Sequence, residues 1–267
     1  MGEDLKRLFT LVVLTLFFTS CSTTKVSHNE NSQEYLLAST LWMQNAAEVR
    51  ALTYQAYNIA RLRLDHDLKY NKSKKKRAIV VDADETVIDN SPYQARNILT
   101  NESYTSENWN KWVQEAQADA VPGAVEFLSY AASKGVEVFY ITNRKVNGFE
   151  ATYINLKNLG FPVKKKNMML RTDGNSKTER RAKVLENHRI VLLMGDTLAD
   201  FSEIFEHKSS VDRKKLADEY RQEFGRKFIV LPNPMYGDWE QALYDYKGDL
   251  ERERLKELRL KNLDPGK

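Results

Sequence analysis

The chain has 267 residues, of which 42% are hydrophobic and 29% are charged, and its formal net charge is +4. That small charge does not argue for nucleic-acid binding, and the single cysteine excludes an intramolecular disulfide. The length suffices for one substantial hydrophobic core, so we expect one domain that carries an insertion.

The first residues have the pattern of an export signal. Two basic residues precede an apolar run over residues 8–18, and small residues follow up to Cys21. The run is shorter than the about 20 apolar residues that a membrane span needs. We predict a signal peptide over residues 1–20, lipid on Cys21 and a polar tether over residues 21–33, because the cysteine's placement resembles a bacterial lipoprotein signal. A signal peptide with an incidental cysteine is the alternative.

After the tether, segments of helical periodicity alternate with short apolar runs. Apolar residues at mostly helical spacing predict one or two helices over residues 34–68, followed by a basic loop over 71–77. In chain order the pattern then predicts a strand over 78–81, an insertion over about 90–121, a helix over 122–134, a strand over 136–142, a helix over 148–159, a strand over 167–170, a helix over 176–187 that Ser176 caps, strands over 190–194 and 228–231, and a charged helix beyond 247. Five strands with intervening helices predict an α/β fold with a doubly wound parallel sheet.

Two aspartates follow the first predicted strand. Asp82 ends the apolar run and Asp84 comes two positions later, so both side chains point to the same side if the chain stays extended. Two carboxylates this close repel each other, and a bound cation or a shared proton would offset the repulsion. A nucleophile beside a general acid fits this pattern. Asp-x-Asp also occurs in turns, whereas a helix-loop-helix calcium loop is excluded because residues 86–88 lack its glycine and further ligands.

Polar residues also follow two other predicted strands. The fourth strand leads to Asp196, with Asp200 four residues later, and the second strand ends in Thr142 and Asn143. Ligands of open α/β sheets bind at the carboxyl ends of the strands. Asp196 at a strand end and Asp200 in the first turn of a following helix would face one cation together.

These residues, in this order, resemble the motifs of the haloacid dehalogenase superfamily. Within it, residues 89–93 are similar to the class C acid phosphatases, which are bacterial lipoprotein enzymes. The resemblance covers about residues 34–245 and implies a haloacid dehalogenase-like Rossmannoid core, with the first and fourth strands adjacent and a small, mainly helical cap over about 90–121. The acid phosphatase domain would span residues 34–267. The resemblance rests on Asp82-Ala83-Asp84-Glu85-Thr86, Thr142-Asn143, Lys177, Gly195-Asp196 and Asp200.

The resemblance also implies a metal and a reaction. Magnesium would be held by Asp82, Asp196 and the backbone carbonyl of Asp84, while Asp200 would act directly or, as we prefer, through a water molecule. Zinc is disfavoured because the site offers neither a thiolate nor clustered histidines. Asp82 would attack phosphorus to form an aspartyl-phosphate. Asp84 would protonate the leaving group and then activate water.

Further residues would bind the substrate. Thr142 and Asn143 would donate hydrogen bonds to the phosphate, and Lys177 would supply positive charge. A cation at a helix start opposes the helix dipole, so the placement of Lys177 favours a catalytic role over that of a surface lysine. Trp109 and Tyr236 stand where the subgroup sandwiches its substrate, and ordinary packing is the alternative for each.

We therefore expect a magnesium-dependent acid phosphatase that acts on small phosphomonoesters, nucleoside monophosphates (5'-nucleotides) in particular. Lipid on Cys21 would anchor it on a bacterial membrane, facing outward from the outer membrane or the cell surface. The sequence leaves a homodimer open. The alternatives are a phosphotransferase on the same scaffold and a non-enzymatic surface lipoprotein that binds a planar ligand such as haem. The intact acids argue against the lipoprotein alternative, because a ligand carrier has no need of them.

Overall fold

The structure is a computed structural model that describes residues 33–248 and 250–266. The predicted signal peptide, the lipidation site Cys21 and nearly all of the tether lie outside the described residues. Within those residues, no helix is long and apolar enough to cross a membrane.

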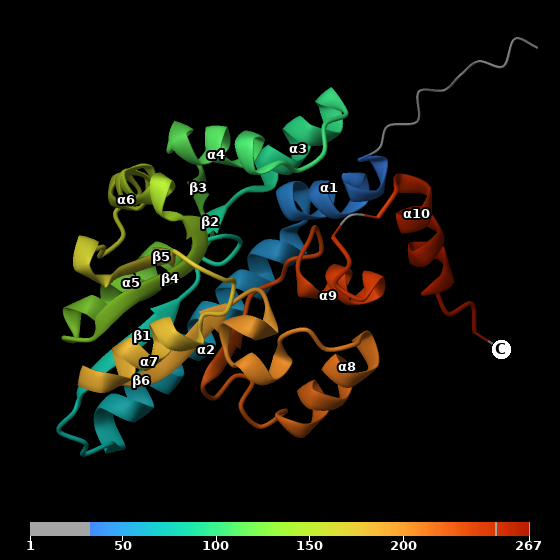
Figure 1. The fold of residues 1–267 in the computed structure, drawn as a ribbon. Coiled ribbons are helices and arrows are strands. Elements are labelled where there is room, and N and C mark those ends of the chain that lie inside the picture. The colour runs from blue at the N-terminus through green and yellow to red at the C-terminus, as the bar shows by residue number, and fades with distance from the viewer. Residues whose placement is uncertain (1–32, 249, 267) are drawn as a thin grey trace, which may run out of the picture. The chain divides into compact units, whose positions relative to one another are not determined.

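A five-stranded sheet forms the centre of the fold (Figure 1). Its order is β5-β4-β1-β6-β7, and every neighbouring pair is parallel. Because β1 lies between β4 and β6, the predicted adjacency of the first and fourth strands is confirmed, and the carboxyl ends of these three strands meet at one edge. The strands are β1 (Lys76–Val81), β4 (Glu137–Lys145), β5 (Met168–Arg171), β6 (His188–Gly195) and β7 (Phe228–Val230).

Helices cover both faces of this sheet. Along β1, Ile79 and Val81 belong to a core that includes residues of α2 and α5, while Ala78 and Val80 belong to a second core that includes Val184 of α7. Alternate residues of a strand point to opposite faces, so each face has its own apolar layer. The predicted doubly wound α/β class is therefore confirmed. The α-helices of the described residues outside the insertion are α1 (Leu37–Asn45), which follows the 3-10 turn η1 (Glu34–Leu36), α2 (Ala47–Tyr70), α5 (Ala124–Ser133), α6 (Phe149–Asn158), α7 (Thr178–Asn187), α8 (Ser210–Glu219), α9 (Asp238–Gln241) and α10 (Arg252–Lys261).

The segment predicted as an insertion contains two helices on a short two-stranded stem. The strands β2 (Ile88–Asp89) and β3 (Asp119–Ala120) pair antiparallel and bring the two ends of the segment together. Between them lie α3 (Ser91–Thr100) and α4 (Ser106–Glu115). The Thr105 side chain caps α4 by accepting a hydrogen bond of 3.0 Å from the backbone N–H of Asn108.

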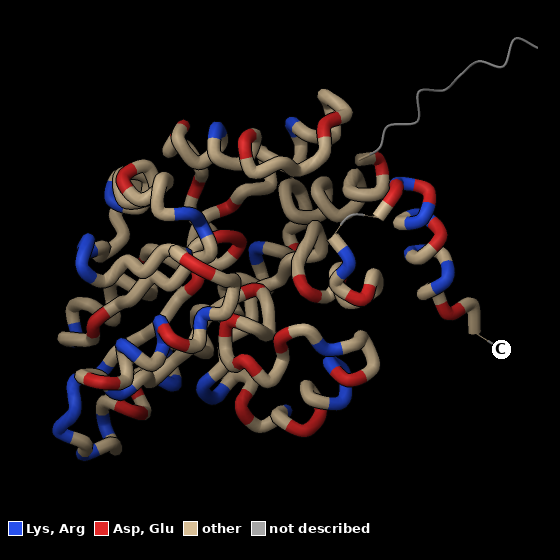
Figure 2. The backbone as a smooth tube through the Cα atoms, in the orientation of Figure 1, with Lys and Arg blue, Asp and Glu red and all other residues tan. Residues whose placement is uncertain are grey.

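Several details of the elements differ from the sequence predictions. β1 begins at Lys76, so the strand includes the last residues of the predicted basic loop. The basic residues of this loop lie at the amino end of β1, away from the strand's carboxyl end (Figure 2). β4 extends to Lys145, three residues beyond its predicted end. The prediction that Ser176 caps a helix was wrong, because α7 begins at Thr178 and Lys177 holds the capping position without a side-chain cap.

Candidate active site

The carboxyl ends of β1, β4 and β6 border a cavity of about 1270 Å³. Residues from η1, the insertion, the loops after β5 and β7, and α10 also line it. The predicted site residues that line the cavity are Asp82, Asp84, Trp109, Asn143, Lys177, Asp196, Asp200 and Tyr236. Thr142, by contrast, is fully buried and is not part of the lining. The structure thus brings all but one of the predicted site residues that it describes to a single cavity.

Three aspartates that follow the two adjacent strands β1 and β6 form a cluster. One carboxylate oxygen from each of Asp82, Asp196 and Asp200 lies within 4.8 Å of the others. The backbone N–H of Asp82 donates to the carbonyl of Met194 at 2.9 Å, which ties the end of β1 to β6. A Cβ atom at Gly195 would lie 2.1 Å from Oδ2 of Asp200, so the approach of Asp200 depends on that glycine. These oxygen donors can hold a divalent metal ion.

Asp200 is fixed through both of its carboxylate oxygens. It closes a capping box with Thr197 at the start of η4 (Leu198–Asp200), where its Oδ2 accepts from the Thr197 backbone N–H at 3.1 Å. Its Oδ1 accepts from Nζ of Lys177 at 2.6 Å. The sequence prediction that Asp200 lies in the first turn of a helix is confirmed, although the helix is a single 3-10 turn.

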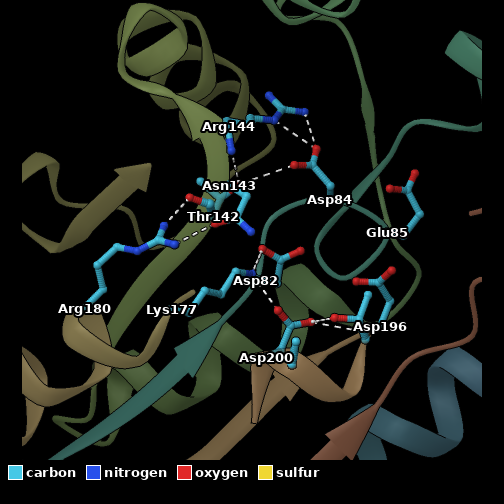
Figure 3. A network of polar contacts seen from close by, with 12 residues as sticks. Asp82, Asp84, Glu85, Thr142, Asn143, Arg144, Lys177, Arg180, Asp196 and Asp200 are labelled. Atoms are coloured by element: carbon cyan, nitrogen blue, oxygen red, sulfur yellow. Dashed lines mark hydrogen bonds and ion pairs between the residues drawn. The ribbon is translucent and has the colours of Figure 1, made fainter. Parts of the chain in front are cut away.

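Lys177 is buried between two of the carboxylates. Its Nζ contacts Oδ1 of both Asp82 and Asp200, as Figure 3 shows. Burial alone lowers the pKa of Lys177, but Asp200 and Asp82 more than offset this effect and raise it above the ordinary lysine value. The side chain therefore stays a cation. Its position at the start of α7 is explained by these two partners, despite the unfavourable helix dipole.

The carboxylate cluster carries more negative charge than its lysine balances. Burial, together with the charges of Asp200 and Asp84, raises the pKa of Asp82 to about 7 against the lowering effect of Lys177. Burial also raises the pKa of Asp196 well above its ordinary value, with contributions from Asp200 and Asp82. Without a metal, the folded protein therefore binds protons at these sites. This stronger proton binding stabilises the metal-free folded state. The stabilisation is fully present at pH values below the ordinary pKa of aspartate and is lost as the pH rises through about 7.

Asp84 lies just beyond the strand and is held by an arginine that the sequence analysis missed. Arg144, buried at the end of β4, approaches Oδ1 of Asp84 with Nε at 2.9 Å and Nη2 at 2.8 Å (Figure 3). Nδ2 of Asn90 donates to the same oxygen at 2.9 Å. Oδ2 of Asp84 has a longer contact of 3.3 Å with the Thr142 hydroxyl. The alternation of Thr142 and Arg144 along an extended strand was the signal that could have identified the arginine.

Thr142 and Asn143 make contacts within the protein. The Thr142 hydroxyl donates to Asp84 and accepts from the Arg144 backbone N–H at 3.1 Å. Nδ2 of Asn143 donates to the carbonyl of Asn175 at 2.9 Å. Arg180 of α7, a second residue that the sequence analysis missed, donates to the Thr142 carbonyl and to Oδ1 of Asn143, each at 2.6 Å. Arg180 thereby fixes the end of β4, and the phosphate-binding roles of Thr142 and Asn143 stay predictions.

The two predicted stacking residues are each held by neighbours. The Trp109 ring on α4 meets the Tyr93 ring edge-on, with centroids 5.0 Å apart, and the Arg144 guanidinium lies 5.6 Å from its centroid. The Tyr236 hydroxyl hydrogen-bonds Oε2 of Glu85. Both aromatic residues line the cavity, so both are available to a substrate there.

Glu85 is a third residue whose role the sequence analysis missed. It is 1% exposed, and its backbone has a φ of 53°, a left-handed value that is unfavourable for glutamate. Its Oε1 accepts from the Asn90 backbone N–H at 2.9 Å, while Oε2 contacts Tyr236. Burial, followed by the charge of Asp84, raises the pKa of Glu85 well above its ordinary value. Glu85 thus joins the loop after β1 to the start of the insertion and to the loop after β7.

Comparison with known proteins agrees with this site. A family model described as HAD superfamily, subfamily IIIB (Acid phosphatase), matches residues 15–239. The chain belongs to this subfamily. The family resemblance predicted from the sequence is thereby confirmed, and the chain is a member of the acid phosphatases.

Solved structures of related proteins have a similar fold. The class C acid phosphatase from Bacillus anthracis superposes with a TM-score of 0.85 and is 43% identical, over 89% of this chain and 100% of that chain. Acid phosphatase 1 of Solanum lycopersicum is 30% identical over 164 residues, which are 59% of this chain and 57% of the tomato protein. The Stem 28 kDa glycoprotein of Glycine max is 26% identical over 201 residues, covering 72% of this chain and 69% of that protein. The match thus spans little more than half of the tomato relative.

Proposed function

We propose that this acid phosphatase hydrolyses phosphomonoesters with magnesium as its cofactor and with a covalent aspartyl-phosphate on Asp82. The observation that carries the proposal is the cluster of Asp82, Asp196 and Asp200, in which Asp82 and Asp200 both bind the buried Lys177. Burying three carboxylates beside one lysine is costly, and a divalent cation bound in the cluster would offset that cost.

The donor set fits magnesium, which prefers oxygen ligands and retains water. Asp82 and Asp196 would hold the ion through their carboxylates and Asp84 through its backbone carbonyl. Asp200 suits a position behind a metal-bound water, because the capping box and Lys177 already use both of its oxygens. When bound, magnesium would reduce the repulsion between the anionic nucleophile and the phosphate dianion.

Asp82 is the proposed nucleophile. An oxygen of Asp82 forms a bond to phosphorus while the bond from phosphorus to the leaving oxygen breaks, which gives the aspartyl-phosphate. Lys177 contacts Asp82 and stays charged, so it would attract the phosphoryl group and stabilise the charge that develops during transfer. Water then attacks phosphorus, and the bond between phosphorus and Asp82 breaks.

Asp84 is the proposed acid and base for these two steps. Arg144 and Asn90 both bind its Oδ1 and thereby fix the orientation of the carboxyl group. Among the contacts of the described residues, Oδ2 has only the longer one to the Thr142 hydroxyl. Oδ2 is therefore the oxygen that would give a proton to the leaving group and later take one from water.

The preferred substrates are proposed to be 5'-nucleotides. Trp109 and Tyr236 line the cavity that contains the aspartates, and stacking of a base on an aromatic ring contributes about 1–3 kcal/mol in other base-binding proteins. The related Bacillus anthracis enzyme has a crystal structure with tungstate bound, and tungstate is a tetrahedral oxyanion like phosphate. This relation supports phosphate as the group that the cavity receives.

We also propose that lipid on Cys21 anchors the enzyme to the outer face of a bacterial membrane. The described catalytic residues all lie after residue 80, so the anchor and the site are separate in the chain. Changing Cys21 to serine should release soluble enzyme of full activity. Palmitate labelling of that variant would contradict lipidation at this position.

A magnesium-dependent assay with adenosine 5'-monophosphate tests the proposed function. EDTA should abolish phosphate release and added magnesium should restore it, while Asp82→Asn should be inactive but folded. Adding an alcohol acceptor separates hydrolysis from phosphotransfer, because a phosphotransferase would form the alkyl phosphate as its main product. Full turnover after exhaustive chelation would contradict the proposal.

A further inference from the structure

Two cations stand side by side at the carboxyl ends of β4 and β5. Lys145 and Arg171 are register partners in this parallel pair, and a shift in the register brings them opposite each other. Lys145 is exposed and Arg171 is half-buried. Like charges at neighbouring positions of a sheet are destabilising. The two positive charges repel each other, and an anion bound between the two side chains would offset that repulsion.

The protein does little to neutralise this pair. In the part of the chain that the structure describes, no carboxylate lies within 4 Å of the charged nitrogens of either residue. Arg171 donates to the side-chain oxygen of Asn175, which is neutral. Asp173 lines a smaller cavity that the two cations also border, yet among the described residues it forms no ion pair with either of them. The positive charge is thus available to a ligand.

Both cations border two cavities. They line the catalytic cavity together with Asp82 and Lys177, and they also line an adjoining cavity of about 440 Å³. Asn147 and Gly174 are likewise shared by the two cavities. A volume of this size is typical of sites for small molecules. Asp82 and the two cations therefore border one continuous cavity.

We propose that Lys145 and Arg171 form a second anion subsite, which binds a second phosphate carried by the leaving group of the substrate. The inference rests on the proposed function and names a substrate class for it: phosphomonoesters that are doubly phosphorylated, such as nucleoside 3',5'-bisphosphates or sugar bisphosphates. The first phosphate is hydrolysed at Asp82, and the second is held by two cations without reacting. Arginine and lysine are both common phosphate ligands.

The test compares adenosine 3',5'-bisphosphate with adenosine 5'-monophosphate. Wild-type enzyme should have the higher kcat/KM for release of the 5'-phosphate from the bisphosphate. The double variant Lys145→Gln, Arg171→Gln should lose about three- to tenfold of that preference, because partly exposed charges interact weakly. The kcat/KM of the double variant for the monophosphate should stay within about twofold of the wild-type value. The matched control is Lys166→Gln, because Lys166 is exposed and borders neither cavity. Equal preference in the wild type and the double variant would overturn the subsite.

A binding measurement separates this inference from the proposed function. Asp82→Asn protein, which should not turn over, is titrated with each nucleotide by calorimetry, with and without the two glutamine changes. Tighter binding of the bisphosphate that disappears in the triple variant supports the subsite whatever the catalytic mechanism is. The same titration with fructose 1,6-bisphosphate and fructose 6-phosphate tests whether a sugar without a nucleobase can also place its second phosphate at the subsite. If each bisphosphate binds with the same affinity as its monophosphate in every variant, the subsite is refuted even when phosphatase activity is present.

Discussion

Replacing Gly195 with alanine should displace Asp200 from the carboxylate cluster. The added Cβ would lie 2.1 Å from Oδ2, 2.5 Å from Cγ and 2.4 Å from Cβ of Asp200, far inside van der Waals contact. Asp200 must therefore retreat by about 1 Å or more, and its 2.6 Å hydrogen bond to Lys177 cannot survive such a shift. Loss of this charged hydrogen bond and of the capping box should cost about 3 kcal/mol of unfolding free energy.

Thermal unfolding and phosphatase kinetics measure the two consequences. A loss of about 3 kcal/mol should lower the Tm of a domain of this size by about 6–12 °C. Activity should fall by about 100-fold, because misplacing a catalytic group by about 1 Å has an effect of that order. Gly248→Ala is the control, since nothing lies within 4 Å of a Cβ built there. Wild-type activity and Tm in Gly195→Ala would refute the assigned packing of Asp200.

Three further predictions concern charge, metal and substrate. Arg144→Gln should lower kcat by about 10²-fold or more with a smaller change in KM, because Asp84 loses the partner that orients it as acid and base; an unchanged kcat would exclude that role. The increase in Tm on adding magnesium to EDTA-treated enzyme should be larger at pH 8 than at pH 5. The pKa of Asp82 is raised to about 7, so this carboxylate is ionised at pH 8 and then destabilises the metal-free fold. Equal increases in Tm at the two pH values would contradict the metal site. Changing Trp109 and Tyr236 to alanine should reduce kcat/KM for nucleoside monophosphates by about tenfold or more and leave glycerol phosphate nearly unaffected; equal losses would mean that the two aromatic residues support the fold.

The sheet and the central acids could be predicted from the sequence because their signals are local. Short apolar runs mark the strands, and Asp82 and Asp196 follow such runs directly. The parallel arrangement then places both aspartates at one edge. A local signal was also the reason that the Ser176 prediction failed. A Ser-x-x-Glu pattern indicates a helix cap at the serine, but here Lys177 takes the capping position and its side chain reaches the two carboxylates.

The supporting residues could not be predicted, because their roles depend on contacts between distant segments. Arg144 is separated from Asp84 by 60 positions, and its contact requires β4 to continue past Thr142. Glu85 and Tyr236 are 151 positions apart, so no local pattern indicates that they meet. Such residues fix the geometry of the site, whereas the motif identifies only the groups proposed to react.

Trapping of a phosphorylated enzyme tests the central proposal most directly. Wild-type enzyme, Asp82→Asn and Asp84→Asn are each incubated with a ³²P-labelled phosphomonoester and magnesium. Each sample is then quenched in acid and digested for peptide mapping. We predict acid-stable, hydroxylamine-sensitive label on the peptide that contains Asp82, with no label in Asp82→Asn. More label should accumulate in Asp84→Asn if that residue activates the water for the second step. Label on a different residue, or undiminished labelling and turnover in Asp82→Asn, would contradict the proposed nucleophile.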